Sequence, residues 1–145
     1  MDKIFIDTDI ILDLMMKRIP YFYSSIKLFN LIENKEIEGF TSSLIFSNLF
    51  YIIKKEQGRE KAIKLLKKLM ILLRILAVDS KIIESGLSSN FKDFEDSIQY
   101  YTATENGLKT LITRNTADYK SAKINIYTAD EYITLYEEKK EIDNN

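Results

Sequence analysis

The chain has 145 residues, 46% of them hydrophobic, which is typical of one globular domain rather than of a disordered segment. It contains no Cys and no His, which excludes disulfides, Cys- or His-based nucleophilic catalysis, and metal sites built on thiolate or imidazole ligands. The 21 basic and 22 acidic residues give a net charge of −1, which excludes a strongly basic nucleic-acid binder but allows a local basic patch.

Hydrophobic periodicity predicts short strands that alternate with amphipathic helices. The predicted strands are 3–6, 37–41, 75–78, 110–113 and 124–127, and the predicted helices are 10–16, 21–34, 43–55, 59–72, 79–87, 93–106 and 128–138. The expected capping residues are Asp9, Ser42 or Ser43, Asp79, Asp93 and Thr128. The alternation favours one domain over residues 1–138, a three-layer α/β/α sandwich with a mainly parallel, roughly five-stranded sheet, and a flexible polar tail over 139–145.

Three acidic residues that are far apart in the sequence are expected to meet at one edge of this sheet. Asp7 follows the first strand, Asp96 lies in the helix before the fourth strand, and Asp118 follows the fourth strand. Open parallel sheets bind ligands beyond the carboxyl ends of their strands, and carboxylates crowded there repel each other until a divalent cation relieves the repulsion. Since the chain lacks His and Cys, the expected ion is one that prefers oxygen ligands, Mg²⁺ or Mn²⁺.

Other polar residues near the same edge are candidates for contacts with water or phosphate oxygens. Thr8, Ser42 and Asn115 offer hydrogen bonds, although turns and helix caps explain them equally well. Arg114 offers a planar guanidinium that suits a phosphate. The segment 54–81 has nine basic and three acidic residues, and it is either a track for an RNA backbone or a solvated helix face.

Three segments, FIDTDIILDL, TSSLIFSNLFYIIKK and DFEDSIQYYTATENGLKTLITRNTADY, resemble PIN domains, in the order in which that family has them. The resemblance is to stand-alone bacterial proteins similar to the VapC-type toxins of toxin–antitoxin modules. It implies an endoribonuclease that uses Mg²⁺ or Mn²⁺ and has an antitoxin protein as partner. It also implies that Asp7, Asp96 and Asp118 are the catalytic and metal-binding acids, with Asn115 at a neighbouring position that is often acidic.

One position departs from the family pattern. The helix after the second strand often supplies a Glu, and the aligned residue here is Asn48, or Ser47 with a shift of one position. Because an amide brings no charge, the alternative is a degenerate PIN domain that binds RNA or a partner without cleaving it. A second alternative is a haloacid-dehalogenase-type phosphatase, in which Asp7 would accept the phosphoryl group, but the segment TRNTADY then has no role.

The predicted helix over 59–72 carries apolar side chains on two sides, which indicates either deeper burial in its own core or a partner, the antitoxin or a second copy in a homodimer. The most apolar stretch, 69–78, has 10 residues and contains Arg74, too short to span a membrane. The amino-terminal residues do not resemble a secretory signal. We therefore expect a cytoplasmic protein without a membrane segment.

Overall fold

The computed structural model describes all 145 residues and contains one five-stranded sheet. The strands are β1 (Asp2–Ile6), β2 (Ile37–Ser42), β3 (Leu73–Leu76), β4 (Thr110–Ile112) and β5 (Asn125–Tyr127). They lie in the order β3-β2-β1-β4-β5, and every neighbouring pair is parallel. The predicted α/β architecture with a parallel sheet is therefore confirmed.

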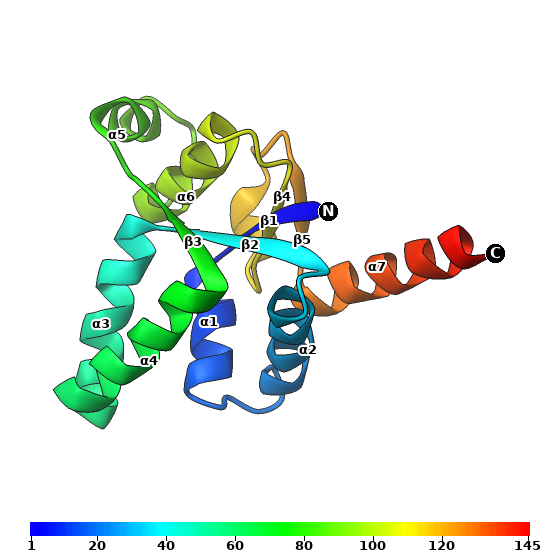
Figure 1. The fold of residues 1–145 in the computed structure, drawn as a ribbon. Helices are drawn as coiled ribbons and strands as arrows, with labels where there is room; N and C mark the ends of the chain where they lie inside the picture. Colours follow the sequence, from blue (N-terminus) through cyan, green and yellow to red (C-terminus); the bar gives the residue numbers. More distant parts are fainter.

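Helices cover both faces of the sheet. They are α1 (Thr8–Met15), α2 (Phe22–Glu33), α3 (Ser43–Gln57), α4 (Arg59–Leu72), α5 (Ser80–Leu87), α6 (Phe94–Glu105) and α7 (Ala129–Asn144), and a short 3-10 helix, η1 (Thr116–Tyr119), follows β4. Figure 1 shows α1 to α4 and α7 on one side of the sheet and α5 and α6 on the other. The chain therefore changes sides between β1 and β4, where a crevice opens beyond the strand ends. None of these helices has the length and apolar character that crossing a membrane requires.

The central strand β1 is enclosed on all sides. Ile4, Phe5 and Ile6 are fully buried in the hydrophobic core. The neighbouring strand packs closely at Gly39, where a Cβ atom would lie only 2.6 Å from a Leu73 side-chain carbon. Because cores packed to this density leave side chains little freedom, the carboxyl end of β1 has a defined position.

Most predicted caps are confirmed, since Ser42, Asp79, Asp93 and Thr128 each accept a hydrogen bond from the first turn of the helix that follows. The exception is α1. Its cap is Asp7, whose side chain accepts from the Thr8 backbone N–H, whereas Asp9 was the predicted cap and instead lies within the first turn.

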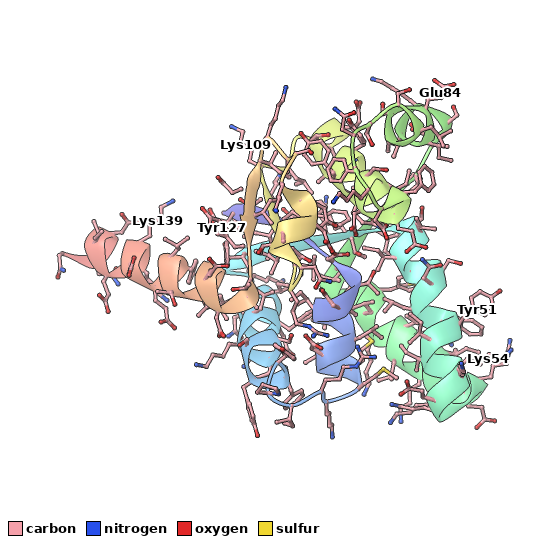
Figure 2. All side chains as sticks on the ribbon, turned by 180° about the vertical axis from the view of Figure 1, so that it is seen from behind. Tyr51, Lys54, Glu84, Lys109, Tyr127 and Lys139 are labelled. Atoms are coloured by element: carbon pink, nitrogen blue, oxygen red, sulfur yellow. The ribbon has the colours of Figure 1, made fainter.

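Two predicted boundaries also differ from the structure. β3 begins at Leu73, directly after α4 and two residues before the predicted start, because Leu73 pairs with Gly39 of β2. α7 continues to Asn144, so the segment expected to be a flexible tail is helical. Figure 2 shows this helix extending from the sheet, with Lys139 in its exposed part.

Candidate active site

A cleft with a volume of about 450 Å³ opens beyond the carboxyl end of β1. Its walls come from the start of α1, from α3, from the start of α6 and from the loop after β4. The polar residues that line it are Asp7, Thr8, Asp9, Asn48, Asp93, Glu95, Asp96, Gln99 and Asn115. Acidic side chains therefore dominate a cleft at the position where open parallel sheets bind ligands.

Asp7 is held by three hydrogen-bond donors. Its Oδ1 accepts from Thr8 N at 2.8 Å, and its Oδ2 accepts from the hydroxyls of Thr113 at 2.9 Å and Tyr119 at 3.0 Å. These bonds favour the ionised carboxylate, but burial outweighs them and, together with the charge of Asp9, raises its pKa to about 6. Asp7 is thus fixed in place and carries a negative charge that its surroundings do not neutralise.

Asp96 faces Asp7 from the first turn of α6, where its backbone N–H donates to the cap Asp93 at 3.0 Å. The Tyr119 hydroxyl lies 3.5 Å from Asp96 Oδ1 and so stands between the two carboxylates. Partial burial, followed by the charges of Asp7, Asp93 and Asp118, raises the pKa of Asp96 to about 7. The crowding of carboxylates expected from the sequence therefore exists for this pair.

Asp118 lies outside the cleft. Its side chain is exposed on η1 and does not line the cavity, although its charge acts on Asp96. No group of three or more acidic side chains in the structure lies close enough to hold a metal ion. The reason is local: successive residues of a 3-10 helix point in different directions, and Tyr119, which is 2% exposed, takes the inner position.

The guanidinium of Arg114, which was expected to contact a phosphate at the site, is instead engaged with other residues of the protein. Its guanidinium pairs with the fully buried Asp13 at 3.0 Å and stacks 4.2 Å from the centre of the Tyr21 ring. Its backbone N–H and the Asn115 side-chain amide both donate to Asp9 Oδ2 at 3.2 Å. Arg114 thus ties the loop after β4 to α1 and leaves the cleft without a resident guanidinium.

The other predicted polar residues divide into two groups. Thr8, Asn48 and Asn115 line the cleft. Ser42 is fully buried behind it, where its hydroxyl donates to Gln99 Oε1 at 2.7 Å. Ser42 therefore supports the cleft wall rather than lining it.

The donors in the cleft fit a divalent cation that prefers oxygen. The charge of Asp7 raises the pKa of Asp96, and the charge of Asp9 raises the pKa of Asp7, so a bound cation would relieve repulsion that protons otherwise relieve. Asp9 Oδ1 is buried without a hydrogen-bond partner, which leaves a further oxygen lone pair in the same region.

Sequence reasoning missed Thr113, Tyr119 and Gln99, and it assigned Asp9, which lines the cleft, only as a helix cap. Gln99 had a usable signal, because it lies three positions after Asp96 in a predicted helix and so falls on the same face. Thr113 and Tyr119 had none, because strand ends and apolar helix faces commonly carry such residues.

Comparison with known proteins agrees with this fold. The chain matches the family model for the PIN domain over residues 3–117. Ribonuclease VapC1 from Aquifex aeolicus (strain VF5) is 29% identical over 137 residues, which cover 90% of this chain and 93% of the relative. DNA-bound VapBC from Salmonella typhimurium has a TM-score of 0.67 at 18% identity, covering 89% of this chain and 99% of that one. A toxin–antitoxin complex from Klebsiella pneumoniae has a TM-score of 0.65 at 22% identity, covering 86% and 96%.

Proposed function

The chain belongs to the PIN domain family, and on this premise we propose that it is a Mg²⁺- or Mn²⁺-dependent endoribonuclease, the toxin of a toxin–antitoxin pair. The observation that carries the proposal is the meeting of Asp7 and Asp96 in the cleft, with pKa values raised to about 6 and about 7. The ribonuclease from Aquifex aeolicus, which aligns along most of this chain, supports RNA as the substrate.

Asp7 and Asp96 would hold the cation, and Asp118, which lies outside the cleft on η1, would add its negative charge nearby without contacting the cation. The bound cation would withdraw charge from the scissile phosphate and lower the pKa of a bound water. Asp96, which lines the cleft opposite Asp7, would orient that water or accept its proton. Attack by the water on the phosphorus would break the bond to the 3′ oxygen, which would leave as a 3′-hydroxyl after taking up a proton from solvent, and the phosphate would stay on the 5′ carbon.

RNA would approach along the basic segment of α3, α4 and the start of α5. α3 contributes Asn48 to the cleft and carries Lys54 and Lys55 in its last turn. Figure 2 shows Tyr51 and Lys54 projecting outward from this helix. Every Lys and Arg of the segment is exposed, and only Arg74 and Lys81 form ion pairs. The free cations of α3 and α4 would meet phosphates on the side of the cleft that α3 forms.

A protein partner is part of the proposal, because the Klebsiella pneumoniae neighbour is a toxin–antitoxin complex. Met70 and Ile71, at the end of α4, are 60% and 85% exposed and give such a partner, or a second copy in a homodimer, an apolar contact. A ribonuclease with this substrate would act in the cytoplasm.

The decisive experiment is cleavage of a labelled RNA with Mn²⁺, with Mg²⁺ and with EDTA, by the wild-type protein and by Asp7→Asn. We expect cleavage that requires a divalent cation and falls by about 100-fold or more in Asp7→Asn, since Asp7 is a ligand or orients one. The variant should stay folded, because it removes a charge that burial disfavours. Metal-dependent cleavage that persists in a folded Asp7→Asn protein would overturn the proposal.

A second function is favoured by Asn48 and by the spacing of the acids in the cleft, no three of which lie close enough together to hold a metal ion: a degenerate domain that binds RNA or a partner without cleavage. The same experiment separates the two, because the degenerate domain binds RNA and leaves it intact under all metal conditions. The phosphatase alternative is set aside, since the family match spans residues 3–117.

A further inference from the structure

Gln99 is a buried polar side chain that the acidic pair does not explain. It lies on α6, is 2% exposed, and nevertheless lines the cleft beside Asp96. Its Oε1 accepts the hydrogen bond from Ser42, whereas its Nε2 makes no hydrogen bond within the protein and is not one of the fully buried atoms without a partner, so it is accessible from the cleft. Buried amides normally have partners at both ends, so one end of this side chain is left for a group that enters the cleft.

The orientation of the amide follows from Ser42. The Ser42 oxygen already accepts a hydrogen bond from Ile45 N at 3.1 Å, as the cap of α3. Its single hydrogen then needs an acceptor, and Gln99 Oε1 is that acceptor at 2.7 Å. The reverse orientation of the amide would leave a buried hydroxyl hydrogen without a partner. The amide NH₂ group therefore faces the cleft.

An NH₂ group donates hydrogen bonds and cannot bind a cation, so its ligand carries acceptor oxygens. The neighbouring Asp7 and Asp96 attract a cation, which in turn draws in a phosphodiester. We propose that Gln99 Nε2 donates a hydrogen bond to a phosphate oxygen of the bound RNA, an inference that rests on the proposed function and names a substrate-binding residue for it. A neutral amide suits this place, because a Lys or Arg would compete with the cation for the carboxylates.

The test is binding of a fluorescent single-stranded oligoribonucleotide in the presence of Ca²⁺, followed by anisotropy, with a gel to verify that the RNA stays intact. Gln99→Met keeps the length of the side chain and removes the amide, and we expect it to weaken RNA binding about tenfold or more. Gln99→Glu keeps the acceptor for Ser42 and replaces the NH₂ group by a charged oxygen, so it should weaken binding further. Asn30→Met, at an exposed position of α2 outside both the cleft and the basic segment, is the control and should bind as the wild type does.

Mn²⁺ affinity, measured by calorimetry, should be unchanged in Gln99→Met, because the amide does not touch the cation. The inference is overturned if Gln99→Met and Gln99→Glu bind RNA like the wild type, if the wild type binds no RNA, or if Mn²⁺ affinity falls together with RNA affinity. If RNA binding depends on Gln99 but no RNA is cleaved with Mg²⁺ or Mn²⁺, the nuclease proposal fails while this inference stands.

Discussion

Tyr119 is the residue through which the two central acids of the cleft are linked. Its hydroxyl lies 3.0 Å from Asp7 Oδ2 and 3.5 Å from Asp96 Oδ1. Burial, and then the charges of the two acids, raise the pKa of this hydroxyl far above its usual range, so it remains a hydrogen-bond donor. By donating, it lowers the pKa of both carboxyl groups and opposes the effect of burial.

The variant Tyr119→Phe therefore has a pH-dependent effect. Above about pH 8 both acids are ionised, and loss of a hydrogen bond to a charged group should lower the free energy of unfolding by about 1.5–3 kcal/mol. Near pH 5 the loss should be smaller, because Asp7 and Asp96 hold protons in the folded state. Urea unfolding of the wild type and the variant at both pH values measures this loss in the free energy of unfolding. Tyr136→Phe, far from the cleft, is the control. An equal loss at both pH values would contradict this role.

The placement of Asp7 and Asp96 could be predicted from the sequence because it depends on topology. A residue directly after a buried central strand and an acid at the start of a helix before the next strand must lie at the same edge of a parallel sheet. The hydrogen-bond partners could not be predicted, since they join Asp7 to residues 106 and 112 positions away, and side-chain direction leaves no trace in the pattern. For the same reason, the sequence does not reveal that the side chain of Tyr119 points towards the cleft acids while that of Asp118 points to solvent.

At the scale of elements, the ion pair of Arg114 and Asp13 joins α1 to the loop that follows β4. Asp13 is 0% exposed and Arg114 is its only ion-pair partner, so Arg114→Met would leave a buried carboxylate offset only by the charge of Arg18, beyond ion-pair distance, and should lower the free energy of unfolding by about 3 kcal/mol. Adding Asp13→Asn to this variant should restore part of the loss. Urea unfolding measures both, with Arg59→Met, at an exposed position, as control. A stable Arg114→Met protein that has lost RNA affinity would instead identify Arg114 as a phosphate contact.

The ends of helices and strands were predictable where the sequence contains a helix-breaking residue and were not predictable where it contains none. Gly58 separates α3 from α4, and both helices lie within two residues of their predicted ends. Between α4 and β3 the chain stays apolar, and only pairing with β2 decides that the strand begins at Leu73. In the extension of α7, Lys140 pairs with Glu36 at 2.8 Å across a separation of 104 residues, a contact that the local sequence does not reveal.

The exposed lysines of α4 test the proposed RNA track. Changing Lys64, Lys67 and Lys68 to Gln should weaken RNA binding at low salt. The slope of the logarithm of the binding constant against the logarithm of the salt concentration should become shallower by about 0.7 for each phosphate that the variant no longer neutralises. Binding of single-stranded RNA over a series of salt concentrations measures this slope. Lys139→Gln, on the far part of α7, should leave the slope unchanged. An unaltered slope in the triple variant would make α4 a solvated face.

At the scale of the whole molecule, the acidic cleft couples folding to pH and to metal. The pKa of Asp7 is raised from an ordinary value of 3.8 to about 6, and that of Asp96 to about 7. Between about pH 4 and pH 7 the folded protein therefore binds more protons than the unfolded chain, so these groups make it less stable as the pH rises. The depressed pKa of Glu36 acts in the opposite direction but only below its ordinary value of 4.5.

Thermal unfolding with and without Mn²⁺, between about pH 8 and pH 5, tests this coupling. Without metal, the melting temperature should rise as the pH falls and the two acids take up protons. With Mn²⁺, the melting temperature should rise most at pH 8, where a cation relieves the same repulsion, and the gain should shrink towards pH 5, where protons compete for the carboxylates. Asp96→Asn should flatten both dependences, whereas Asp143→Asn, at the exposed end of α7, should leave them unchanged. A Mn²⁺ effect that does not vary with pH would place the cation away from Asp7 and Asp96, because ions bound elsewhere do not compete with these two protons.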